Sequence, residues 1–151
     1  DLLLNTLPGY LSGAIPPYAQ PDFGITYAPQ ISKEEGRIEW SQSAWEIERK
    51  VRAFTPWPGT FTTWEGQQLK IHSGIPDDNA PTQVFSLFRE DRSERYMNTP
   101  PGTVMERDGR AEIVTNDGVF CPTAVQLAGK KAVSIHDFIN GHPNFIGATL
   151  E

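Results

Sequence analysis

The sequence predicts a mainly β domain with one principal helix, and three observations support this fold class. One segment near residues 43–55 has the spacing of an amphipathic helix. Beyond it the chain consists of short runs rich in β-branched and aromatic residues, separated by turns that contain glycine. With 151 residues, of which 38% are hydrophobic, the chain is large enough for one domain with a real core.

The N-terminal part of the chain is predicted to be helical and then extended. Residues 1–12 have leucines at helical spacing, with an interruption or end around Pro8-Gly9 and a stop at Ser12-Gly13. The stretch AIPPYAQPDFG that follows holds three prolines and no helical period, which favours an extended linker. We therefore divide the chain into residues 1–20, the end of an upstream helix plus a linker, and residues 21–149, the folded domain.

The first and last residues of the chain lead to two further predictions. Because the first residue is Asp1 and not Met, and because it enters what reads as the middle of a helix, we expect an upstream portion. The final pair, Leu150-Glu151, has two interpretations, a remnant of cloning or a natural terminus.

The principal helix has clear signals at both ends. Ser43 and Glu46 have the capping-box spacing, which satisfies two backbone donors that would otherwise lack partners. One face then carries an apolar stripe, formed by Ala44, Ile47, Val51 and Phe54. The run PWPG at residues 56–59 cannot continue a helix, because each proline lacks an amide proton and biases the residue before it towards extended backbone. The helix is therefore predicted to end near Phe54 or Thr55.

Strands and turns dominate the rest of the chain. TFTTW and QQLKIHSG bracket Glu65-Gly66, a hairpin signal, and VFSLF at residues 84–88 follows as a further candidate strand. From residue 103 onwards, short β-rich runs alternate with Asp108-Gly109 and Asp117-Gly118, which predicts an antiparallel meander. Ser134 opens a short last helix, SIHDFING. Five or six short strands favour a closed or nearly closed barrel of the OB-like type, since closure removes exposed edges.

Charge and composition narrow the functional classes. Thirteen basic and nineteen acidic residues give a net charge of −6, which argues against a protein that coats itself non-specifically in nucleic acid. Most basic residues are interleaved with carboxylates, and Lys130-Lys131 is the least neutralised positive spot. No apolar run reaches the roughly 18 residues of a membrane span. The single cysteine, Cys121, cannot form an internal disulfide and fits a reducing compartment such as the cytosol.

The sequence offers no catalytic or metal-binding motif. The three histidines, His72, His136 and His142, lack the spacing that would enclose a metal ion. Cys121 precedes a proline in a strand-like run, where a buried small hydrophobe is expected rather than a reactive thiolate. We expect no catalytic residue, no metal and no cofactor in this chain.

The four tryptophans leave two interpretations open. Trp40, Trp45, Trp57 and Trp64 can stack on nucleic-acid bases at the surface of an OB-type barrel, or they can fill its core. For Trp40 and Trp57, which flank the principal helix, we favour the core.

Four blocks of the sequence stand in a recognisable order: TYAPQISKEEGRIEWSQSAWEIERKVRAFTPWPGTF, GQQLKIH, PPGTVMERDGRAEIVTNDG and VQLAGKKAVSIHDFINGH. In order and spacing they resemble the C-terminal domain of bacterial methionyl-tRNA formyltransferases. The resemblance runs from about Leu2 to Gly147, and its most specific parts are KEEGRIEW, PWPG and VQLAGKK.

The resemblance implies an OB-like domain that a linker joins to a Rossmann-like catalytic domain. The whole enzyme of this family transfers a formyl group from 10-formyltetrahydrofolate to the methionine of initiator tRNA. Its catalytic residues belong to the other domain, whereas the barrel and linker hold the tRNA through a positively charged face. Carried across, this makes five residues candidates for phosphate contacts: Lys33, Arg37, Lys70, Lys130 and Lys131.

The partners implied by the resemblance are initiator methionyl-tRNA and the protein's own catalytic domain. A cytoplasmic monomer without membrane contact is expected. Two departures lower the local positive potential: Gln30 stands where many members carry Lys, and residues 75–99 are longer and more acidic than the usual connection. A structural barrel that braces the catalytic domain is one alternative function. Another is the same fold in a sugar-nucleotide formyltransferase or a formyltetrahydrofolate hydrolase.

Overall fold

The computed structural model describes residues 1–77, 96 and 98–151, which form two compact units, Asp1–Gln30 and Ile31–Glu151. The first unit holds helix α1, Leu2–Leu11, followed by residues without regular structure up to Gln30. This agrees with the predicted helix and extended linker, although α1 continues through Pro8. The candidate strand at 84–88 lies outside the described residues.

The second unit begins with a one-turn helix and the principal helix. The 3-10 helix η1 spans Glu34–Gly36, and α2 spans Ala44–Phe54. The predicted capping box is present: the backbone N–H of Glu46 donates to Ser43 Oγ at 3.3 Å, and the Ser43 N–H donates to Glu46 Oε2 at 2.9 Å. The predicted stripe faces the core, with Ala44, Ile47 and Val51 buried and Phe54 half-buried.

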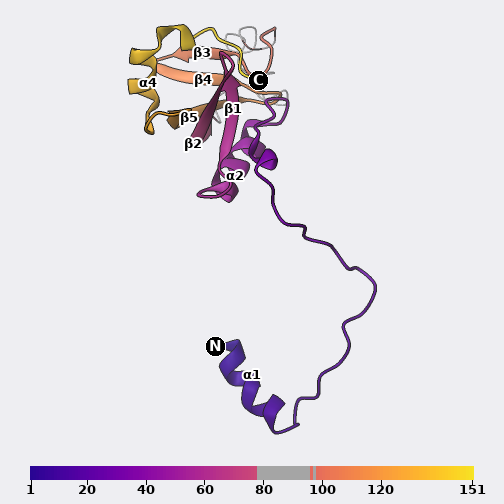
Figure 1. The fold of residues 1–151 in the computed structure, drawn as a ribbon. Coiled ribbons are helices and arrows are strands. Elements are labelled where there is room, and N and C mark those ends of the chain that lie inside the picture. Colours follow the sequence, from indigo (N-terminus) through magenta and orange to yellow (C-terminus); the bar gives the residue numbers. More distant parts are fainter. Residues whose placement is uncertain (78–95, 97) are drawn as a thin grey trace. The chain divides into compact units, whose positions relative to one another are not determined.

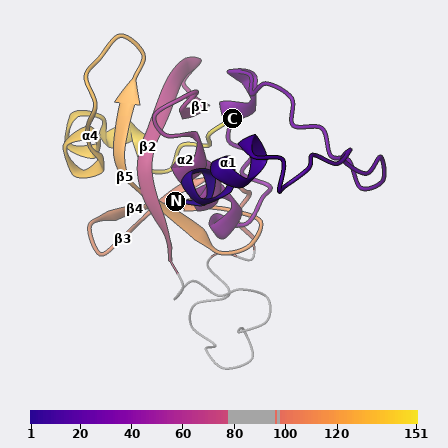
Figure 2. The ribbon, with the colours of Figure 1, turned by 90° about the horizontal axis from the view of Figure 1, so that it is seen from below.

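Six antiparallel strands make up the sheet: β1 Thr60–Trp64, β2 Gln67–Asp77, β3 Val104–Arg107, β4 Arg110–Val114, β5 Val119–Leu127 and β6 Val133–Ser134. Their order is β1-β2-β5-β4-β3 (Figure 1). Strand β6 pairs with β5. The two longest strands, β2 and β5, lie side by side (Figure 2). The predicted hairpin at Glu65-Gly66 is confirmed, since Trp64 pairs with Gln67. The predicted meander is confirmed as well: Arg107 pairs with Arg110 across Asp108-Gly109, and Val114 pairs with Val119 across the longer connection that contains Asp117-Gly118.

The C-terminal segment, residues 147–151, connects the two edge strands of this sheet. On one side the backbones of Thr63 and Glu151 exchange two hydrogen bonds of 2.7 and 3.0 Å. On the other side the Val104 N–H donates to the Ala148 carbonyl at 2.8 Å. The sheet is therefore closed through this segment, in agreement with the predicted mainly β barrel.

A last helical pair covers part of the barrel. Helix α4 spans Ile135–Gly141, and the 3-10 helix η3 spans Pro143–Phe145. As predicted, Ser134 caps α4 by accepting the Asp137 N–H at 3.1 Å. The rings of Trp64, Phe138 and Phe145 meet edge to face with centroids 5.1–5.5 Å apart, which joins these helices to the hydrophobic core.

The tryptophans divide evenly between core and surface. Trp40 and Trp64 are 5% and 2% exposed, so the core prediction for Trp40 is confirmed. The core prediction for Trp57 is wrong, because its side chain is 55% exposed. The PWPG corner meets the barrel through the backbone of Gly59, which packs closely against Gly36, and Trp57 remains outside this contact.

Candidate nucleic-acid interface

The sheet register aligns four residues on the outer face of the barrel. Arg37 forms a parallel bridge with Phe61, Phe61 pairs with Lys70 on β2, and Lys70 pairs with Gln126 on β5. Paired residues of neighbouring strands point to the same side of a sheet. Their neighbours along the strands point inward and are buried: Thr60, Thr62, Leu69, Ile71, Val125 and Leu127. We call Arg37, Phe61, Lys70 and Gln126 the cationic row.

Arg37 is held at its place in the row by its backbone. Its own N–H donates to the Glu34 carbonyl at 3.0 Å, and its carbonyl accepts from the Lys50 ammonium. The next residue, Ile38, donates its N–H to the Phe61 carbonyl at 2.8 Å. The guanidinium lies over the Phe61 ring, with its central carbon 5.8 Å from the ring centroid. The position of this cation therefore follows from the fold and not from a flexible loop.

Gln126 connects the row to the turn that carries Lys130. Its Nε2 donates to the Lys130 carbonyl at 2.7 Å, and its Oε1 lies 2.9 Å from His72 Nε2. The Lys130 N–H in turn donates to the Leu127 carbonyl at 2.9 Å. The side-chain amide of Gln126 thus has a partner at both its nitrogen and its oxygen. These two contacts hold the turn between β5 and β6 in place relative to β2 and β5.

The structure brings some of the five predicted phosphate contacts together and leaves others apart. Arg37 and Lys70 belong to the row, and the Lys130 backbone is bound to it. Lys131 is exposed in the same turn as Lys130. Lys33 precedes η1, at the opposite end of that single turn from Arg37, and among the described residues no hydrogen bond or ion pair links its side chain to the row.

The five candidate cations share with Arg49, Lys50 and Arg110 the lack of an acidic ion-pair partner in the described part of the chain. Among residues 1–77, 96 and 98–151, none of the five forms an ion pair. By contrast, Arg52 pairs with Glu48 at 3.1 Å, and Arg107 pairs with Asp77 and with the buried Glu112. Although the net charge is −6, no ion pair within the described residues neutralises the cations of the row or of its adjoining turn.

A second polar cluster lies at the far end of β2 and takes part in no recognisable chemistry. Arg107 binds Asp77 and Glu112, and the Tyr96 hydroxyl donates to Glu112 at 2.6 Å. Burial, together with the hydrogen bond to Glu112, raises the pKa of Tyr96. Burial also raises the pKa of the nearby Cys121 thiol to about 11, so it stays protonated at neutral pH. Cys121 is a buried small hydrophobe, as predicted.

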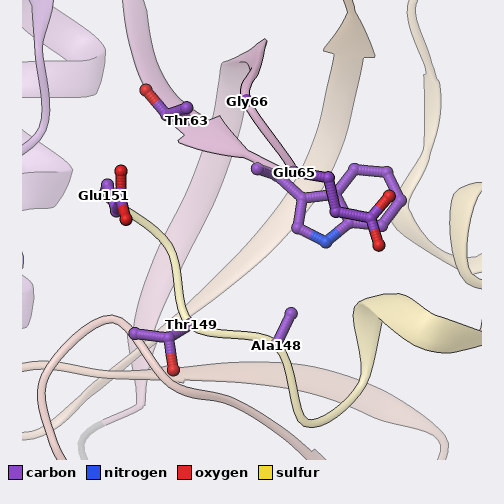
Figure 3. A pocket seen from close by; sticks show the side chains of 7 residues that line it. Thr63, Glu65, Gly66, Ala148, Thr149 and Glu151 are labelled. Carbon is purple, nitrogen blue, oxygen red and sulfur yellow. The ribbon is translucent and has the colours of Figure 1, made fainter.

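A shallow pocket of about 320 Å³ lies between the β1–β2 turn and the C-terminal segment (Figure 3). Its charged groups are the carboxylates of Glu65 and Glu151, which disfavour a phosphate. The indole N–H of Trp64 is buried there without a protein acceptor, and Glu65 accepts from Asn144 at 2.6 Å. The pocket is therefore not part of the cationic surface. In the described residues no group of three His, Cys, Asp or Glu side chains is placed to hold a metal ion.

Sequence reasoning missed Phe61, His72 and Gln126 as members of this face. Phe61 had a usable signal, because a two-residue turn at Glu65-Gly66 places it opposite Lys70 by simple counting. The pairing of Lys70 with Gln126 has no local signal, since it joins strands that are distant in sequence.

Three comparisons place these observations among known proteins. A profile of the family described as "Formyl transferase, C-terminal domain" matches residues 30–143. Methionyl-tRNA formyltransferases of Roseiflexus castenholzii and Acidiphilium cryptum are similar, at 38% identity over 141 residues and 40% over 140 residues. Each alignment covers 93% of this chain and 40% of the relative, so the chain spans about two fifths of the length of these proteins.

Solved structures of HypX from Aquifex aeolicus share the fold. One variant superposes with a TM-score of 0.59 at 19% identity, covering 95% of this chain and 24% of that one. A complex of HypX with tetrahydrofolic acid gives a TM-score of 0.55 at 20% identity, covering 91% and 22% of the two chains. At these identities the likeness concerns the fold alone. In the described part of this chain, no helix is both long enough and apolar enough to cross a bilayer.

Proposed function

The chain belongs to the formyl transferase C-terminal domain family, and on that premise we propose that it is the tRNA-binding domain of a methionyl-tRNA formyltransferase. In this proposal the cationic row and the adjoining turn hold the phosphate backbone of initiator methionyl-tRNA. The parent enzyme transfers the formyl group of 10-formyltetrahydrofolate, and a separate catalytic domain carries out that chemistry. The proposed role in translation initiation places the protein in the cytoplasm, as a monomer.

One observation carries the proposal: Arg37 and Lys70, neither of which forms an ion pair among the described residues, share the row in a protein whose net charge is −6. A phosphate backbone binds through such charges, because each contact releases condensed counterions from the RNA. The acidic remainder of the protein repels RNA that approaches elsewhere, so the row also determines the orientation in which the RNA binds the domain. The names of the curated relatives, methionyl-tRNA formyltransferases at 36–40% identity, support tRNA as the polyanion.

Fluorescence anisotropy with labelled initiator tRNA, titrated with salt, tests the proposal. If about four phosphates are contacted, the slope of log affinity against log salt is about −3 to −4. The variant Lys70→Glu is expected to weaken binding and to make this slope shallower by about one. Arg110→Glu is the matched control, because Arg110 is exposed on β4, outside the row, and the charge change is identical. A flat salt response, or equal losses in both variants, would refute the proposal.

The double variant Lys130→Glu/Lys131→Glu separates tRNA binding from a bracing role. Both side chains are exposed, so unchanged thermal stability is expected in either case. Weaker tRNA binding at unchanged stability supports the proposal. Unchanged tRNA affinity would instead favour a barrel that only braces the catalytic domain.

A further inference from the structure

We propose that Arg37 and Phe61 form a stacking platform for an unpaired base of the bound RNA. The inference rests on the proposed function and goes beyond it, since it assigns one part of the row to a base and not to phosphate charge. It predicts that this face distinguishes single-stranded RNA from duplex.

The geometry of the pair leaves one side of the guanidinium available. The central carbon of the Arg37 guanidinium lies over the Phe61 ring at 5.8 Å from its centroid, within the range of a cation–π contact. The Arg37 side chain is exposed, and among the described residues it has no carboxylate partner and no hydrogen bond. The guanidinium therefore keeps its hydrogen-bonding and stacking capacity for a ligand.

A planar guanidinium can stack on a nucleobase as well as bind a phosphate. Guanidinium is delocalised and weakly hydrated, and it stacks on flat π-systems, which an ammonium group cannot do. Bases within an RNA duplex are stacked inside the helix, so only an unpaired base can reach such a platform. Lys70, which pairs with Phe61 on β2, lies next to the platform and supplies a charge for the flanking phosphate.

Hydrogen bonds hold the backbone of the platform in place in the free protein. The Arg37 backbone is held by the Glu34 carbonyl, the Lys50 ammonium and the hydrogen bond between Ile38 and Phe61. A preformed site loses little conformational entropy on binding, which raises the affinity obtained from a single stacked base.

The test compares Arg37→Lys with the intact 151-residue chain. Two RNA probes are used in anisotropy titrations, a short single-stranded oligoadenylate and a blunt RNA duplex with the same number of phosphates. Because the charge is kept and the plane is lost, Arg37→Lys is expected to bind the single strand about 5- to 10-fold more weakly. Binding of the duplex should change by less than about twofold, and the salt slope should stay the same.

Two further variants complete the design. Phe61→Leu removes the supporting ring and should weaken single-strand binding in the same direction. Arg52→Lys is the matched control, because Arg52 is exposed on α2 and already pairs with Glu48, and it should leave both probes within about twofold. Thermal unfolding verifies that each variant is folded.

The outcomes distinguish the two proposals. If wild type binds tRNA with the expected salt slope and Arg37→Lys leaves both probes unchanged, the stacking platform is wrong and the tRNA-binding role stands. Equal weakening for single strand and duplex also overturns the platform. If wild type binds no RNA, both proposals fall.

Discussion

Trp40 and Thr62 form a hydrogen bond inside the barrel, in which the indole Nε1 donates to Thr62 Oγ1 at 3.0 Å. The same hydroxyl donates to the Glu151 carbonyl at 2.8 Å. Thr62 is fully buried. This relay of two hydrogen bonds therefore gives the buried Trp40 N–H an acceptor and attaches the C-terminal segment to β1. The segment in turn reaches β3 through Ala148 and Val104, so one threonine side chain contributes to closing the barrel.

Thr62→Val should therefore destabilise the domain. The variant keeps the shape of the side chain but leaves the Trp40 N–H buried without an acceptor, at a cost of about 1–3 kcal/mol in the free energy of unfolding. Chemical denaturation measures this loss. Thr63→Val, the same change at the next position, whose side chain is only half-buried, should stay within about 0.5 kcal/mol. Equal effects of the two variants would contradict the relay.

Gly36→Ala should affect both stability and RNA binding. A methyl group at Gly36 would overlap the Gly59 carbonyl oxygen, and because that atom is backbone the two segments must separate. We expect a loss of about 1–3 kcal/mol and weaker tRNA binding, since Arg37 would move away from Phe61. Gly141→Ala is the control, because no atom lies within 4 Å of the added carbon. Unchanged tRNA affinity in Gly36→Ala would argue that the placement of Arg37 is unimportant.

The capping box of α2 predicts a pH dependence at the acidic end. The hydroxyl and N–H of Ser43 lower the pKa of Glu46, because both hydrogen bonds favour its charged form. A lowered pKa stabilises the folded state above the ordinary range of Glu, and this contribution is lost as the pH falls through the lowered value. The stability difference between wild type and Ser43→Ala should therefore be larger at about pH 7 than at about pH 3.

Denaturation curves at both pH values measure that difference. Ser41→Ala serves as the control, since Ser41 precedes the helix cap and makes no hydrogen bond with Glu46. A difference between wild type and Ser43→Ala that does not change with pH would contradict the assignment.

The buried thiol of Cys121 predicts that the folded protein becomes less stable as the pH rises into the alkaline range. Burial raises the pKa of its thiol to about 11, above the roughly 8.5 of an exposed thiol. The neutral thiol is favoured in the folded state, so its stabilising contribution is complete below about pH 8.5 and is lost as the pH rises towards 11. The stability of wild type should fall over this range, and that of Cys121→Ala should fall less.

Reaction with a thiol reagent gives an independent measurement of the same thiol. In folded protein at neutral pH, Cys121 should react slowly, and at the full rate only in denaturant. Fast labelling of the folded protein would show that the thiol is accessible and that the predicted pH dependence is unfounded.

The elements that depend on interactions between near neighbours in the chain could be predicted from the sequence. The bounds of α2 follow from Ser43 and Glu46 at one end and from the PWPG run at the other. The hairpin at Asp108-Gly109 follows from two residues that tolerate positive φ. These interactions join residues a few positions apart, so a short sequence pattern is enough to predict them. The four blocks that carry the family resemblance are also local sequence patterns.

Which distant residues share the cationic row follows from the packing of the strands. Lys70 meets Gln126, Phe61 meets Arg37, and the C-terminal segment closes the barrel between β1 and β3. The same is true of Trp40 and Trp57, which flank one helix with similar local signals and yet differ in burial. Strand pairing and side-chain burial depend on how distant segments pack together and on which apolar surfaces they bury against each other. The spacing of residues within one segment does not determine either of them.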